Sequence, residues 1–151
     1  MINNEILKKI YDVVTNDLIE PCTLIHSKFF IDAEGNQKFL PIKEIESKYP
    51  VLLTDTINIT LAPDLRNVTY NMIMDYLVPG SEDLSDVPEI HEKANNIINT
   101  IIFALINDRK GYQLKSGVVM TPVMRMGKEL LAGYRCIFTI ATQNNFSNCC
   151  K

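Results

Sequence analysis

The chain has 151 residues, of which 46% are hydrophobic and 22% charged, and its formal net charge is −3 at pH 7. This length suits one domain with a proper core, and the composition argues against a disordered chain. The acidic balance argues against a nucleic-acid binder, which needs clustered Lys and Arg to displace counterions from phosphates. We therefore expect a single domain over residues 1–151.

The cysteines predict neither a metal centre nor a disulfide framework. Cys22, Cys136, Cys149 and Cys150 form no CxxC pair, and only two histidines accompany them. Closed zinc sites use clustered Cys and His, and disulfide frameworks belong mostly to small secreted domains. The N-terminus lacks the apolar core of a signal peptide, and no apolar run reaches membrane-spanning length. We expect no metal, no cofactor and no membrane contact, and a reducing cytoplasm or a particle assembled there.

The first predicted element is an amphipathic helix within residues 1–20. Its apolar stripe recurs at helical spacing, Pro21 ends it, and the stripe consists of Ile6, Ile10, Val13, Val14 and Leu18. Such a stripe packs on the chain's own core or, because it is terminal, on a neighbouring subunit. We keep Ile6, Ile10 and Val13 as candidate subunit contacts.

Residues 22–31 predict one strand, rich in β-branched and aromatic side chains. A turn over residues 32–37 and a short return strand follow, and residues 43–55 predict a short helix or loop closed by Pro50. His26 stands alone in the first of these strands. Because a catalytic base needs an oriented partner, we expect it to be packed or solvated.

The next segment predicts a β-hairpin. Apolar and polar residues alternate over residues 57–61 and again over 68–78, and a polar loop with Pro63, Asp64 and Arg66 joins the two runs. Asp75 has apolar neighbours that allow partial burial, and the simplest expectation is a solvent-facing position. We expect the methionines here to fill the core, and we keep Asp64 and Arg66 as candidate subunit contacts.

Residues 85–111 predict the clearest helix. One face of a 3.6-residue period carries Ile90, Ala94, Ile97, Ile98, Ile101 and Leu105. Asp86 and Glu89 have the spacing of a capping box, and Pro88 falls in the first turn. Arg109 and Lys110 suit the last turn, with Gly111 ending the helix. This pattern is typical of a core helix that lies across a sheet.

An acidic segment precedes this helix, and a histidine lies in its first turn. The acidic run Gly80–Asp86 is expected to be a flexible connection, with contact to a basic partner as the alternative. His91 lies in the first turn beside Glu92 in sequence. Because adjacent helical residues do not face each other, the two form no dyad.

Residues 117–126 and 130–142 predict two closing strands joined by a turn at 126–129. Pro122 implies a sheet edge or a bulge, because proline cannot donate to the ladder. Cys136 reads as a small buried hydrophobe. The tail 144–151 is expected to fray or to dock Phe146 on a neighbour. Pro122, Arg125 and Phe146 complete the candidate subunit contacts.

Enzyme motifs are absent from the sequence. It contains no GxGxxG, GxxxxGK[ST], HExxH or GxSxG, so we identify no catalytic residue and expect a non-enzyme. The elements together predict an α+β fold. Its mostly antiparallel sheet would have about four to six strands, with one long helix packed across it and an N-terminal helix.

This order of elements resembles the small neck proteins of tailed bacteriophages, of the tail-terminator and head–tail connector type. The segments that carry the resemblance are TINITLAPDLRNVTYNMIMDYLV, the long helix, and VVMTPVMRMGKELLAGYRCIFTIATQNN with its Gly133-Tyr134 entry to the last strand. The Ile- and Asn-rich character is similar to neck-ring proteins of crAss-like phages.

The resemblance implies a virion structural protein, assembled in the host cytoplasm. It implies a homo-oligomeric neck ring that joins portal or head to tail, contacts neighbouring portal, connector or tail proteins, and encloses the DNA ejection channel. DNA would pass without specific binding. The alternative from another class is a small cytoplasmic binding or regulatory module without catalytic activity, and an enzyme with a dispersed site is the third.

Overall fold

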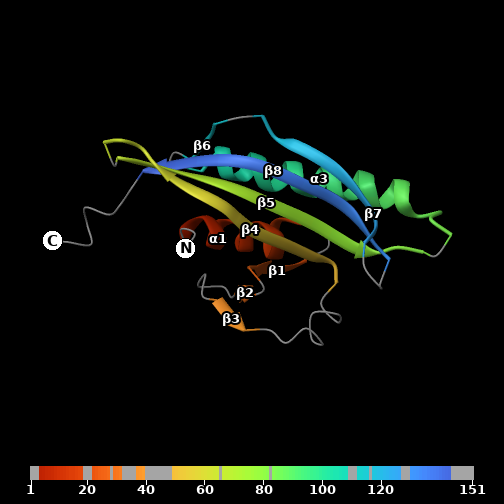
Figure 1. Cartoon of the computed structure of the whole chain (residues 1–151). Coiled ribbons are helices and arrows are strands. Elements are labelled where there is room, and N and C mark those ends of the chain that lie inside the picture. Colours follow the sequence, from red (N-terminus) through yellow and green to blue (C-terminus); the bar gives the residue numbers. More distant parts are fainter. Residues whose placement is uncertain are drawn as a thin grey trace.

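The computed structural model describes residues 4–18, 22–27, 29–31, 37–39, 49–64, 66–81, 83–108, 112–115, 117–126 and 130–143. The chain is an α+β protein in which one sheet carries helices on a single face (Figure 1). Helix α1 (Asn4–Asp12) continues into a π-helical segment, η1 (Val13–Asp17), and α3 (Val87–Ile106) is the long helix.

Within the described ranges, the sheet contains eight strands, namely β1 (Thr23–His26), β2 (Phe29–Ile31), β3 (Gln37–Phe39), β4 (Val51–Leu61), β5 (Asn67–Pro79), β6 (Gln113–Leu114), β7 (Val119–Met126) and β8 (Leu131–Gln143). Their order is β3-β2-β1-β4-β5-β8-β6, and β7 pairs with β8 beside β6. Every pair is antiparallel except β1 with β4. Five strands have four residues or more, within the predicted range. The other three are too short to show a period.

The core lies between the sheet and the helices. The alternation in β5 buries one face, from Val68 to Tyr76, against the apolar stripe of α3. Met72 and Met74 are fully buried, which confirms the prediction that they fill the core. The α1 stripe joins the same cluster. Burial of these side chains is the main source of stability in such a layer.

The predicted strand over residues 22–31 is in fact two strands. Ser27 turns the chain between β1 and β2 with a φ of 49°, a left-handed conformation that non-glycine residues rarely adopt. Its N–H donates to the Thr54 carbonyl at 3.0 Å, and its hydroxyl donates to Asp55 at 2.7 Å. These bonds to β4 stabilise a reversal that the local sequence does not signal.

The strand β4 also begins earlier than predicted. It starts at Val51, directly after Pro50, where we expected a helix or loop. Val51 and Leu52 are both buried, because this end of the strand has apolar contacts on both faces of the sheet. The hairpin of β4 with β5 is as predicted. At its turn, the Ala62 N–H donates a hydrogen bond to the Asn67 carbonyl.

The ends of α3 differ from the prediction. Asp86 is the N-cap residue but makes no side-chain capping bond, so the capping box is wrong. Its carboxylate instead accepts bonds from the Ser81 N–H at 3.0 and 3.1 Å. The helix ends at Ile106, and the Asn107 amide donates to the Phe103 carbonyl at 2.9 Å. Residues 109–111, predicted to form its last turn and its stop, lie outside the described residues.

The acidic connection before α3 is held by hydrogen bonds and is not a loose linker. Asp83 accepts bonds from the Ser85 N–H at 3.1 Å and from the Ser85 hydroxyl at 2.8 Å. Bonds from Ser81 and Ser85 lower the pKa of Asp83 to about 2, because they stabilise its ionised form. The loop thereby fixes the direction in which α3 leaves the sheet.

Candidate interaction surfaces

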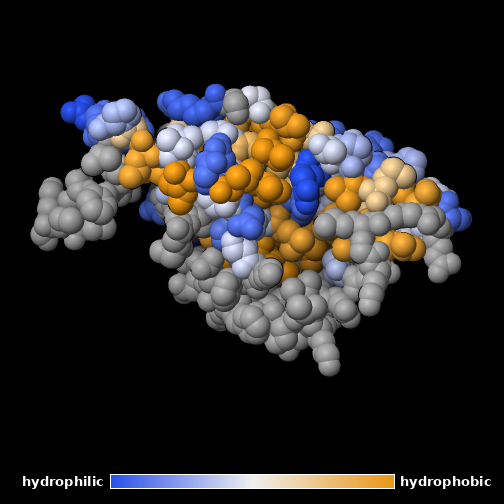
Figure 2. All heavy atoms as spheres, viewed as in Figure 1, coloured by the Kyte–Doolittle hydropathy of each residue, from blue (hydrophilic) through white to orange (hydrophobic). Residues whose placement is uncertain are grey.

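The sheet has one face on which no described helix packs. The helices share the core cluster on the other face, and Figure 1 views the open face with α3 behind it. Three apolar side chains lie in register across the open face, Ile73 of β5, Ile137 of β8 and Val119 of β7. Val119 is 59% exposed and Ile137 38% exposed. Figure 2 shows apolar atoms gathered over this face.

An ion pair with a buried carboxylate and a partly exposed arginine lies beside this apolar row. Asp75 and Arg135 are cross-strand partners, and Nε and Nη2 of the arginine each donate to a different carboxylate oxygen at 2.9 Å. Asp75 is only 5% exposed, so the expected solvent-facing position is wrong. Its burial is tolerated because the bidentate pair satisfies both oxygens. The bonds and charge of Asp75 also raise the pKa of Arg135.

A polar row lies on the other side of the apolar row. The Asn71 amide donates to Asn58 of β4, and the Thr139 hydroxyl of β8 donates to the Asn71 oxygen at 2.5 Å. These bonds cross three strands. They order the surface side chains without covering the apolar row.

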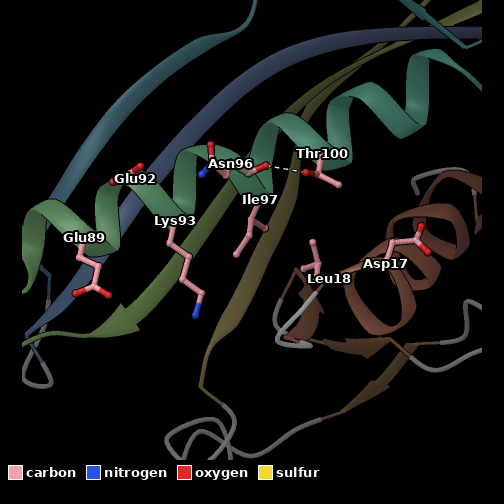
Figure 3. Close-up of a pocket in the computed structure, with 8 residues that line it drawn as sticks. All are labelled: Asp17, Leu18, Glu89, Glu92, Lys93, Asn96, Ile97 and Thr100. Carbon is pink, nitrogen blue, oxygen red and sulfur yellow. Dashed lines mark hydrogen bonds between the residues drawn. The ribbon is translucent and has the colours of Figure 1, made fainter.

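One recess lies on the helix side, between η1 and the first half of α3 (Figure 3). Its volume is about 480 Å³. Leu18 and Ile97 point toward one another across it, Glu89 and Lys93 form part of its rim, and Glu92 points away (Figure 3). An apolar floor with a mixed charged rim suits weak binding. Among the residues that line it, no acid and base converge on one point as catalysis requires.

Both histidine side chains make polar contacts inside the fold. His26 is buried, and its Nδ1 lies 2.8 Å from the Thr54 hydroxyl. His91 Nε2 lies 3.0 Å from the Val123 carbonyl, so this nitrogen carries the proton and donates. The His91 ring packs edge-on against Tyr134, with ring centres 5.3 Å apart. His91 therefore ties α3 to β7.

Burial of His26 predicts that the protein is less stable in mild acid. Desolvation lowers its pKa below the ordinary 6.5, so the folded protein holds it neutral while the unfolded chain binds a proton. This contribution to stability is complete above pH 6.5 and is lost as the pH falls from there toward the lowered pKa. We expect the urea midpoint to fall between pH 7.5 and pH 5.5. His26→Gln should reduce that fall, and an equal fall in the variant would assign it to other groups.

The two described cysteines are structural. Cys22 and Cys136 are buried, and burial raises the pKa of each thiol to about 12. A protonated thiol is a poor nucleophile. Cys136 is the small buried hydrophobe that the strand pattern predicts. Cys149 and Cys150 lie outside the described residues.

The described ranges contain no cluster of three or more His, Cys, Asp or Glu side chains placed to hold a metal ion. Within the same ranges, no helix combines the length and the apolar character needed to cross a membrane.

The predicted subunit contacts lie in different environments. Ile6, Ile10 and Val13 are at most 1% exposed, so the chain uses this stripe for its own core, the first of the two alternatives. Asp64 and Arg66 are exposed at the hairpin turn, where the Arg66 N–H donates to Asp64 at 3.0 Å.

Pro122 lies on a strand at the other side of the sheet. Pro122 is exposed on β7. Among the described strands, β7 pairs only with β8, and the pairing has a register shift after Val123. Of the two predicted alternatives, the edge is therefore the one found at Pro122, which is itself in register with Tyr134. The side chain of Arg125 and all of Phe146 lie outside the described residues. Sequence reasoning missed the apolar row of the open face. The available signal was that β5, β7 and β8 carry apolar residues on both faces.

No protein-family model matches the chain, and no curated protein matches its sequence.

Proposed function

We propose that this chain is a virion structural protein that forms a ring in the neck of a tailed bacteriophage, between portal or head and tail. The observation that best supports the proposal is the exposed apolar row on the sheet face that no described helix covers. A helix layer covers one face, while the other face leaves Val119 and Ile137 exposed. A patch of this kind on a small protein is a typical protein–protein contact.

A second apolar patch lies on the opposite layer of the molecule. Phe103 is 68% exposed and Ile106 is 42% exposed on α3, and a shallow recess adjoins Phe103. Cyclic rings use heterologous contacts, in which one patch meets a different patch on the next copy. Two apolar patches on opposite layers suit this arrangement. The net charge of −3 suits a channel wall that DNA passes without binding.

Electron microscopy and sedimentation of the purified protein test the proposal. We expect rings, with a mass many times the 17.2 kDa of one chain. Phe103→Asp and Val119→Asp should each dissociate the rings without unfolding the protein, because both side chains are already exposed. Asn67→Asp is the control, as Asn67 is exposed at the start of β5, away from both patches. A monomer that binds a small ligand in the recess beside α3 would instead favour the binding module.

A further inference from the structure

The outer half of β4 is an open sheet edge. β1 pairs with β4 only from Val51 to Thr54, while β5 accompanies β4 on its other side as far as Leu61. Among the described residues, no strand pairs with Asp55–Leu61 on the side of β1. Figure 1 shows this half of β4 extending past β1.

The backbone of this edge presents hydrogen-bonding groups that no strand in the described part of the chain pairs with. The Ala62 N–H donates to the Asn67 carbonyl, so Ala62 points toward β5. Successive residues of a strand point their N–H and C=O groups to opposite sides, and pairing is regular from Asn58 to Leu61. Asn58 and Thr60 therefore also point toward β5. Ile59 and Leu61 point their N–H and C=O groups outward.

The side chains of this edge suit strand pairing. Ile57, Ile59 and Leu61 are 51%, 39% and 53% exposed. Residues 56–62, TINITLA, contain no charged residue, no proline and no glycine. Natural edge strands are normally protected by charges, proline or short length. A bulge between Thr56 and Asn58 is the only such device on this segment, and pairing with β5 resumes beyond it.

The opposite edge of the sheet is protected. The Lys115 N–H donates to the Thr139 carbonyl, so Thr139 points toward β6 and β7, as do Ile137 and Arg135 by alternation. Pro122 pairs with Tyr134 and therefore lies at an outward position, where it offers no N–H. The neighbouring strand β6 has only two residues. A strand added at this edge would lose bonds, so β4 is the favoured edge.

We propose that β4 of one copy pairs antiparallel with β4 of a second copy about a two-fold axis at Thr60. Ile59 then lies opposite Leu61 of the second copy, and the outward N–H and C=O groups of both residues all find partners. Thr60 lies opposite Thr60, and Asn58 lies opposite Ala62. No charge opposes a like charge, because the segment has none. This inference goes beyond the proposed ring and does not depend on it, since a two-fold contact closes after two copies.

A disulfide trap tests the register. With Thr60→Cys in a Cys149→Ser, Cys150→Ser background, the paired Cα atoms would lie about 4.5 Å apart, as in a non-hydrogen-bonded pair. This distance is within disulfide range. The matched control is Asn58→Cys on the same strand, whose two copies would be offset by four residues, roughly 13 Å. We expect Thr60→Cys to form a non-reducing dimer band and Asn58→Cys to form little. Equal cross-linking of the two, or none with Thr60→Cys, overturns the register.

Sedimentation equilibrium tests the contact itself. We expect the wild type to show the two-copy contact, by itself or within larger rings, and at least a tenfold weaker association at this contact for Ile59→Lys, because charge on an edge opposes pairing. Met124→Lys is the control, since Met124 is 54% exposed on the protected β7 edge. Thermal melts of both variants confirm the fold. If the wild type forms rings, the Thr60→Cys band within them reports the same contact. A wild type that never pairs, or an Ile59→Lys variant that pairs as well, overturns the proposal.

Discussion

Gly133→Ala is expected to cost about 4 kcal/mol or more of the free energy of unfolding, an exceptional value for one methyl group. Gly133 lies in β8 opposite Leu77 of β5. A Cβ atom built there would lie 1.7 Å from the carbonyl oxygen of Tyr76 and 2.8 Å from its carbonyl carbon. Both atoms are backbone in the centre of the sheet, so relief requires the two strands to move apart.

Gly117→Ala is the matched control for this substitution. Apart from its chain neighbours, nothing lies within 4 Å of a Cβ built at Gly117, so we expect a change within about 0.5 kcal/mol. Urea denaturation of both variants measures the difference, and failure of Gly133→Ala to express as folded protein agrees with it. A loss below about 1 kcal/mol at Gly133 would mean that β5 and β8 separate easily at this point. The close approach would then not hold the sheet together.

The sequence predicts the parts of this fold that repeat a period over many residues. The stripe of α3 and the alternation of β5 and β8 each span three turns or more than ten residues, so chance matches are few. These are also the elements at the centre of the core. The edge position of β7 was predictable from Pro122 alone, because proline lacks the N–H donor that a central strand needs.

The parts that the sequence did not predict depend on distant partners. Ser27 reverses the chain through bonds to Thr54 and Asp55, which lie 27 or more residues away. Val51 and Leu52 are buried on both faces, so they show no alternation. Asp86 is a residue type that often caps helices, but its carboxylate accepts a hydrogen bond from the Ser81 N–H instead. In each case a tertiary contact overrides the local pattern.

The candidate surfaces were predictable only in part. Exposure of the hairpin turn with Asp64 and Arg66 followed from its polar loop. The open edge of β4 did not, because the alternation of Ile57 and Ile59 indicates a strand and does not reveal its neighbours. Whether the edge is open depends on how far β1 pairs along β4, and only the three-dimensional structure shows where that pairing ends.

Arg135→Met is expected to cost about 3 kcal/mol of the free energy of unfolding, because breaking a buried ion pair leaves an uncompensated charge. The Asp75 side chain is 7% exposed and the Arg135 side chain 42% exposed, so the loss falls mainly on the carboxylate. The expected value lies at the low end for buried pairs, since water reaches the arginine side. Urea denaturation at pH 7 measures it. Lys115→Met is the control, an exposed lysine on the same side of β8, with an expected change within about 0.5 kcal/mol.

The double variant Asp75→Leu, Arg135→Met distinguishes two contributions to the free energy of unfolding. One is the cost of leaving the Asp75 charge unpaired, and the other is the net stabilisation by the ion pair. Leu53 and Arg135 flank Asp75 in the ladder, so a leucine there gains apolar contact. Replacing both partners of a buried pair with apolar residues is often neutral or stabilising. We therefore expect the double variant to recover most of the stability that Arg135→Met loses. If it is as unstable as the single variant, the pair contributes through its own attraction, and the open face needs that charge to hold β5 against β8.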